Sequence, residues 1–135
     1  MKNYFKDNIK KISKSYIAKL EKEIDNYFKF CDSENEKNQS KLVKCYTLSG
    51  LCHYLGITRN DIGIIIENKK SEHIISNAKL TIENFIEENL LNGKISASSA
   101  IIVLKYNFSW TDKLQKENES GDIYVDFGMN PEYSE

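Results

Sequence analysis

The sequence has little proline, histidine and arginine, and each shortage excludes a class of structure or site. One proline in 135 residues favours long helices over a succession of tight turns. The two histidines, His53 and His73, stand in no zinc-ligand or catalytic-triad spacing with the cysteines. Gly93 and Lys94 lack the other residues of a phosphate-binding loop. We therefore expect no enzyme, no metal site and no cofactor.

Cysteines are also few, and long apolar runs are missing. Cys31, Cys45 and Cys52 are an odd number without framework spacing, which predicts free thiols in a reducing cytoplasm. The longest apolar run, at residues 62–66, is too short to span a membrane, and the basic start lacks the apolar segment of a secretory signal. The first helix is basic and could lie on a membrane surface, but packing within the domain or on another copy explains it better. We expect no membrane partner.

Charge is distributed unevenly along the chain, although the formal net charge is only -1. Residues 1–20 hold six lysines and one aspartate, whereas residues 112–135 hold seven acids and two lysines. Ends of opposite sign suggest different partners or head-to-tail contact between copies. Ordinary variation of surface charge is the competing explanation.

Apolar residues recur at spacings of three and four along most of the chain, which predicts an all-α fold. Residues 1–44 are expected to form a long amphipathic helix, with an apolar stripe from Ile9 to Cys31, and then a polar loop at residues 32–41. Residues 71–110 are expected to form a helical hairpin, with Ser71 and Ser96 as N-caps and Gly93 ending the first helix.

Together, the apolar faces of these helices exceed what one small domain can bury, so the hairpin is predicted to mediate oligomerisation. The residues expected to contact another copy are Ile75, Ala78, Ile82 and Phe85.

Residues 45–70 have the pattern of a helix-turn-helix. Thr47 is suited to cap a short helix, Gly56 supplies the left-handed turn, and Thr58 with Asp61 has the spacing of a capping box. Cys52 is the small residue that lets the two helices approach. The apolar residues required on the inner side are Leu51, Leu55, Ile57, Ile62 and Ile65. Two ordinary core helices joined by a tight turn would have the same pattern.

The outward positions of the second helix of this corner are predicted to be Arg59, Asn60, Gly63 and Glu67, and the first two suit contact with DNA. Arg59, the only arginine, and Asn60 can each make bidentate hydrogen bonds to base edges. Asp61 and Glu67 would repel phosphates, so one copy is expected to bind weakly. Further affinity would come from several copies or from lysines, although ordinary solubility explains any single lysine better. The lysines concerned are Lys10, Lys11, Lys14, Lys69 and Lys70.

Residues 111–135 form an acidic C-terminal tail in which Ile123, Val125 and Phe127 alternate with polar residues, as on one face of a strand. A single strand has no partner in a helical chain. Either the tail is disordered, or several copies pair their strands in a small barrel. The expected fold is thus all-α, with a helix-turn-helix corner, a long helical hairpin and a short C-terminal β segment used in oligomer assembly.

From Tyr46 to Lys113 the chain resembles the small terminase subunits of tailed bacteriophages. The matching stretches are YTLSGLCHYLGITRN and IISNAKLTIENFIEENLLNGKISASSAIIVLKYNFSWTDK. They contain the family's Thr-x-x-Gly-Leu start, its Leu-Gly-Ile turn, its long helix and its Gly-x-x-x-Ala/Ser segment. The chain departs from the pattern at Ser109, where glycine is common, and in beginning its second helix with RNDIG.

The resemblance implies a ring of many subunits that recognises the start of packaging on double-stranded viral DNA in the host bacterial cytoplasm. It also implies that the protein recruits and regulates the large terminase subunit, which carries the ATPase and nuclease activities. The C-terminal segment would dock that motor, and Thr58, Arg59 and Asn60 would contact DNA. Two other functions stay open: a dimeric transcriptional regulator reading two half-sites, and a helical adaptor that never contacts nucleic acid.

Overall fold

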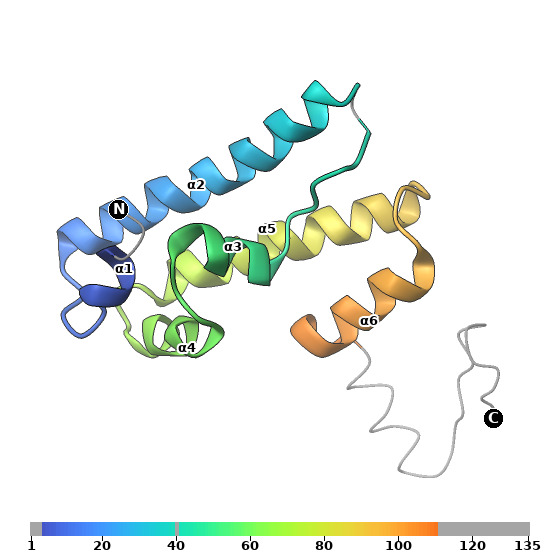
Figure 1. Cartoon of the computed structure of the whole chain (residues 1–135). Helices are drawn as coiled ribbons and strands as arrows, with labels where there is room; N and C mark the ends of the chain where they lie inside the picture. The colour runs from blue at the N-terminus through green and yellow to red at the C-terminus, as the bar shows by residue number, and fades with distance from the viewer. Residues whose placement is uncertain (1–3, 40, 111–135) are drawn as a thin grey trace, which may run out of the picture. The chain divides into compact units, whose positions relative to one another are not determined.

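The structure is a computed structural model that describes residues 4–39 and 41–110, and these residues form helices and connecting segments without a strand (Figure 1). The chain divides into two compact units, Met1–Phe85 and Ile86–Glu135, with the boundary inside the fifth helix. The described helices are α1 (Tyr4–Asp7), α2 (Lys14–Lys37), α3 (Leu48–Leu55), α4 (Arg59–Glu67), α5 (Glu72–Leu91) and α6 (Ala97–Phe108). The prediction of a helical protein is therefore confirmed for this part of the chain.

The start of the first long helix differs from the prediction. The apolar spacing placed Ile9 on that helix, but α2 begins only at Lys14, where the Ser13 hydroxyl accepts the backbone N–H of Tyr16. The chain before Ser13 forms the separate short helix α1. The buried Tyr16 hydroxyl donates to the Phe5 carbonyl oxygen at 2.8 Å and holds α1 against α2. Ile9 is buried because this segment packs on the core, so its apolar character reflects burial rather than helix.

The end of α2 also differs from the prediction. The polar stretch at residues 32–41 was expected to be a loop, but α2 continues through it to Lys37. A helix needs an apolar stripe only where it packs, and Ser, Glu, Asn and Lys are all compatible with a solvated helical extension. Asn35 supports this extension because its side chain accepts the backbone N–H groups of Val43 and Lys44 from the segment that follows.

Tyr27 joins α2 to the start of α3. Its hydroxyl accepts the Thr47 backbone N–H at 3.1 Å and lies 3.3 Å from the Thr47 carbonyl oxygen, to which it can donate. The Thr47 hydroxyl accepts the backbone N–H of Gly50, which confirms Thr47 as the N-cap of α3. A Cβ at position 50 would meet the Tyr27 hydroxyl more closely than real Cβ atoms approach any atom. Packing therefore requires glycine in the Thr-x-x-Gly-Leu landmark.

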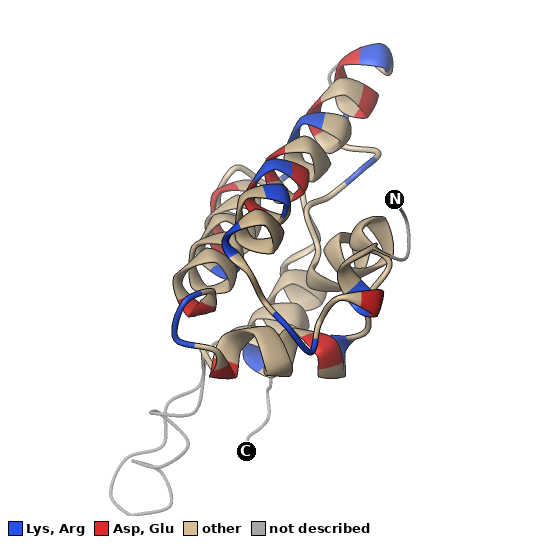
Figure 2. Ribbon diagram, turned by 90° about the vertical axis from the view of Figure 1, so that its left-hand side faces the viewer, with Lys and Arg blue, Asp and Glu red and all other residues tan. Residues whose placement is uncertain are grey.

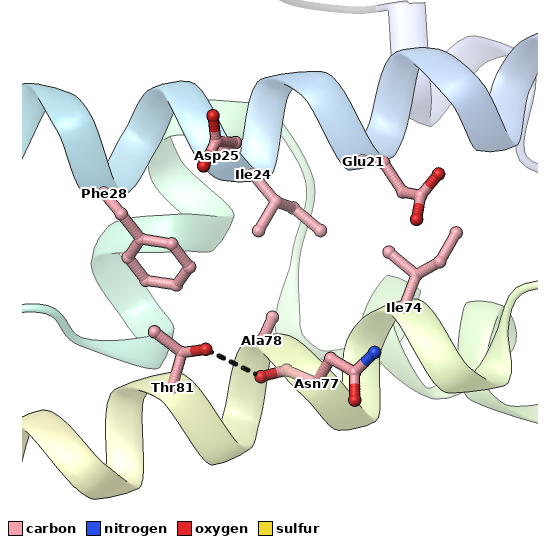
Figure 3. A pocket seen from close by; sticks show the side chains of 8 residues that line it. All are labelled: Glu21, Ile24, Asp25, Phe28, Ile74, Asn77, Ala78 and Thr81. Carbon is pink, nitrogen blue, oxygen red and sulfur yellow. Dashed lines mark hydrogen bonds between the residues drawn. The ribbon is translucent and has the colours of Figure 1, made fainter.

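α2 and the first part of α5 lie side by side and run in the same direction (Figure 1). A pocket of about 210 Å³ lies between them, with Glu21 opposite Ile74 at one end and Phe28 opposite Thr81 at the other (Figure 3). Ser71 stands directly before α5, as predicted, but its buried hydroxyl donates to the Ile65 carbonyl oxygen at 2.8 Å. It therefore fixes the end of α4 to the start of α5.

The unit after Phe85 contains the end of α5 and all of α6. Gly93 has a φ of 72°, and the backbone N–H groups of Gly93 and Lys94 donate to the carbonyl oxygens of Leu90 and Asn89. This is the left-handed helix end predicted from the glycine. Ser96 caps α6 by accepting the backbone N–H of Ser99, also as predicted. The predicted strand residues Ile123, Val125 and Phe127 lie outside the described residues.

Candidate nucleic-acid interface

The helices α3 and α4 are joined by a tight turn at Gly56, where the sequence predicts one. Gly56 has a φ of 77°, and the backbone N–H groups of Gly56 and Ile57 donate to the carbonyl oxygens of His53 and Cys52, ending α3. Three residues connect the two helices, because α4 begins at Arg59. All the predicted inner residues are buried: Leu51, Cys52, Leu55, Ile57, Ile62 and Ile65.

The start of α4 is closed by a capping box. The Thr58 hydroxyl accepts the backbone N–H of Asp61 at 3.1 Å, and the Asp61 carboxylate accepts the backbone N–H of Thr58 at 2.9 Å. The prediction of this box is confirmed. The Thr58 hydroxyl is therefore already an acceptor in the cap, although Thr58 itself is exposed, as a DNA contact requires.

Asp61 is buried, with 7% of its surface exposed, so it does not face outward as the expected repulsion of phosphates requires. The Lys6 ammonium from α1 lies 3.0 Å from its carboxylate. The hydrogen bond from the Thr58 backbone and the Lys6 charge together lower the pKa of Asp61. The carboxylate therefore stays ionised, and the adjacent Lys6 ammonium offsets its negative charge. Sequence reasoning missed Lys6, because the two residues are 55 positions apart and no local pattern links them.

The outer face of α4 is formed by residues that recur one helical turn apart. Arg59, Gly63 and Glu67 form one row, and Asn60 and Ile64 form the next. All five are exposed, which agrees with the predicted outward positions and adds Ile64, whose side chain is an apolar group at 46% exposure. A helical wheel drawn from Asn60 would have placed Ile64 here. The Arg59 guanidinium also donates to the Ser49 hydroxyl at 3.4 Å, so it extends from α4 toward the first turn of α3.

The predicted lysines are exposed, and they lie in two places along the chain. Lys69 and Lys70 follow the end of α4, and Lys10, Lys11 and Lys14 lie where α1 passes into α2. Figure 2 shows that basic and acidic residues are interleaved along the helices rather than gathered on one side. Each lysine group therefore adds local positive charge close to acidic residues.

The residues predicted to contact another copy lie mostly inside the chain. Ile75, Ala78 and Ile82 are at most 2% exposed, because they face the core of the unit that contains α2, α3 and α4. Phe85 is partly exposed, and its ring stacks on Tyr46 with centroids 4.2 Å apart. The helical spacing correctly predicted that this face of α5 is buried, but at these three positions other residues of the same chain bury it. They offer no surface for a contact between copies.

The cysteines and acidic residues of the described part of the chain form no further site of the kinds considered from the sequence. Within residues 4–39 and 41–110, no group of three or more His, Cys, Asp or Glu side chains is placed to hold a metal ion. Cys31, Cys45 and Cys52 are free thiols, and burial raises the pKa of each. None of the helices in the described part of the chain is both long and apolar enough to cross a membrane.

Residues 12–117 match a known protein family, and this range covers most of the structure described above. The family described as DNA-packaging protein gp3 matches residues 12–117. The chain belongs to this family. The match extends from the loop before α2 to beyond α6 and so includes the whole α3–α4 pair. It agrees with the resemblance to small terminase subunits in the sequence. No curated protein and no solved structure matches the chain.

Proposed function

We propose that the chain is a small terminase subunit, which oligomerises, recognises double-stranded viral DNA and recruits and regulates the large terminase subunit. Membership of the DNA-packaging family is the observation that carries this proposal. The outer face of α4, on which Arg59 and Asn60 are exposed, supports the DNA-binding part of it. The large subunit supplies the ATPase and nuclease activities, so this chain needs no catalytic site of its own.

In this proposal α3 and α4 act as a helix-turn-helix, and α4 enters the major groove. Arg59 and Asn60, in the first turn of α4, are the residues that reach base edges. The burial of Asp61 favours this orientation, because the carboxylate closest to Arg59 and Asn60 is turned into the cap and paired with Lys6. Glu67, at the other end of α4, stays exposed and weakens the approach to phosphates.

Each copy is expected to bind DNA weakly and with modest sequence preference, because one arginine cannot specify many bases. The exposed lysines contribute through phosphate contacts, whose strength falls steeply with salt. Several copies on one DNA molecule turn these weak contacts into usable affinity, since each bound copy raises the effective concentration of the next.

The contact between copies is assigned to the exposed apolar residues of α6, because the core positions of α5 are covered. Ile102 is 56% exposed and Tyr106, one turn further along, is 76% exposed. Ala97, Ser98 and Ser99 precede them and are also exposed. Exposed apolar residues on a helix mark a contact with another protein, and a second helix face that also carries small and large apolar residues can fit against them. We take that surface to belong to another copy of this chain.

Fluorescence anisotropy with labelled duplex DNA tests the DNA-binding part of the proposal. Arg59→Ala and Asn60→Ala should each weaken binding by about tenfold, which is the usual loss for one base contact. Ser33→Ala, at an exposed position on α2, is the matched control and should bind as the unmodified chain does. Glu67→Gln should strengthen binding to every duplex, because it removes a repelling charge. Equal binding by all four variants would show that α4 does not contact DNA.

A further inference from the structure

Gly63 is a glycine that the fold of the chain does not require. It lies in the interior of α4 without the left-handed backbone seen at Gly56 and Gly93, and a Cβ built on it meets nothing within 4 Å. Gly50 in α3 has the opposite property, since a Cβ there would collide with Tyr27. An interior glycine weakens a helix relative to alanine. No contact in the described part of the chain therefore requires a glycine at position 63.

Ile64 is the second unexplained residue on the same face. Its side chain is 46% exposed, whereas Ile62 and Ile65 of the same helix are buried. It stands one turn after Asn60, as Gly63 stands one turn after Arg59. The exposed surface of α4 thus combines two hydrogen-bonding side chains, a position without a side chain and an apolar group.

We propose that Gly63 lets α4 approach the floor of the major groove and that Ile64 contacts the 5-methyl group of a thymine there. This inference rests on the proposed function, and it names the base chemistry that the same surface reads. The thymine methyl is the apolar group that the major groove presents, and contact with it needs an apolar side chain free of protein neighbours. Asn60, one turn earlier, is suited to an adenine in the same groove.

Charge supports DNA as the partner of this face rather than another protein surface. The Asp61 carboxylate is withdrawn into the cap and paired with Lys6, and Lys69 and Lys70 follow the end of α4. Positive charge near a helix that enters a groove lined by phosphates strengthens its binding. Arg59 lies in the first turn of α4, and Lys69 and Lys70 follow its end, whereas Glu67 is the opposing charge.

The test begins with selection of duplexes from a random double-stranded DNA library by the full chain. Each thymine of an enriched duplex is then replaced by uracil, which pairs identically but lacks the methyl group. For the unmodified chain, one replacement should weaken binding by about fourfold, the value expected for loss of one buried methyl contact. Ile64→Ala should bind the thymine and uracil duplexes equally.

Gly63→Ala separates a role in binding from a role in folding. The added methyl group should raise the melting temperature, because it strengthens α4, and should weaken DNA binding at least tenfold, because it holds the helix away from the groove. A role limited to folding cannot give this combination. Ser33→Ala on α2 is the control, and it should leave DNA binding unchanged.

The outcomes distinguish this inference from the proposed function. If the chain binds DNA in a salt-dependent way but enriches no sequence, or if no uracil replacement matters and Gly63→Ala binds normally, the inference is wrong and the proposed function stands. If the chain binds no duplex at all, DNA recognition by this chain is wrong, and this inference is wrong with it.

Discussion

The Lys6 ammonium lies 3.0 Å from the Asp61 carboxylate, and this ion pair joins α1 to the capping box of α4. Lys6 belongs to the basic start of the sequence, and Asp61 belongs to the helix whose outer face carries Arg59 and Asn60. The N-terminal segment therefore reaches the start of α4, where the Lys6 ammonium offsets the charge of the buried Asp61 carboxylate.

The stability of the protein should depend on the ionisation of Asp61 in acid. Its pKa is lowered from an ordinary value of 3.8, first by the Thr58 backbone hydrogen bond and also by Lys6. Because the folded protein holds this proton less tightly than the unfolded chain, the stabilisation is present above pH 3.8 and is lost as the pH falls through the lowered pKa. Thermal unfolding followed by circular dichroism should show that Asp61→Asn melts lower at neutral pH but approaches the unmodified chain in acid.

Asp25→Asn provides the control for this measurement. Asp25 pairs with Lys29 on the surface of α2, where an exposed ion pair contributes little. Its melting temperature should therefore follow that of the unmodified chain at every pH. An Asp61→Asn variant that melts a constant interval below the unmodified chain, down to the lowest pH, would contradict the assigned role of the carboxylate.

Two Gly→Ala substitutions in neighbouring helices should have effects of opposite sign. Gly50→Ala places a methyl group against the Tyr27 hydroxyl and should cost about 1–3 kcal/mol of unfolding free energy, as overpacking does. Gly63→Ala meets open space and should add about 0.5–1 kcal/mol. Urea denaturation measures both. In a Tyr27→Phe background the cost of Gly50→Ala should shrink, and an unchanged cost would rule out the Tyr27 contact as its cause.

The residues predicted correctly from the sequence are those whose signal is local. Thr47, Gly56, the Thr58–Asp61 pair and Gly93 each act within a few positions of themselves, and the structure confirms them all. The start of the first helix was wrong because Ile9 matches a helical period while it packs as part of another segment. The packing of Tyr27 against Gly50 joins α2 to α3, and no spacing within either helix predicts it.

The candidate site also contains residues that a local pattern predicts and others whose environment depends on a distant part of the chain. Arg59 and Asn60 were predicted to face outward, because the cap and the buried stripe fix the rotation of α4. The burial of Asp61 could not be predicted, since it depends on Lys6 from a distant part of the chain. For Ile75, Ala78 and Ile82, helical periodicity identified a face that must be covered, but it does not identify what covers it.

Removal of residues 114–135 should separate folding from recruitment of the large terminase subunit. The last turn of α6 is closed by the backbone N–H groups of Ser109 and Trp110, which donate to the Leu104 carbonyl oxygen, so the described helices end before the deletion. Circular dichroism should show an unchanged helical signal and melting temperature. The truncated chain should fail to stimulate the ATPase of the large subunit, and normal stimulation would remove this role from the C-terminal segment.

A charge placed on the exposed face of α6 should break the contact between copies. Ile102→Glu puts a carboxylate where the proposed interface is apolar, so size-exclusion chromatography with light scattering should give smaller species. Ser76→Glu, at an exposed position on α5, adds the same charge elsewhere and should leave the assembly intact. If both variants assemble as the unmodified chain does, another surface mediates the contact.

Native mass spectrometry of the purified, unmodified chain tests the central claim most directly. A packaging subunit that obtains its DNA affinity from many weakly binding copies should appear as one closed assembly of more than two chains. A chain that remains a single copy at high concentration would contradict this account. A stable dimer at physiological salt would contradict it as well, and would favour a regulator that reads two half-sites.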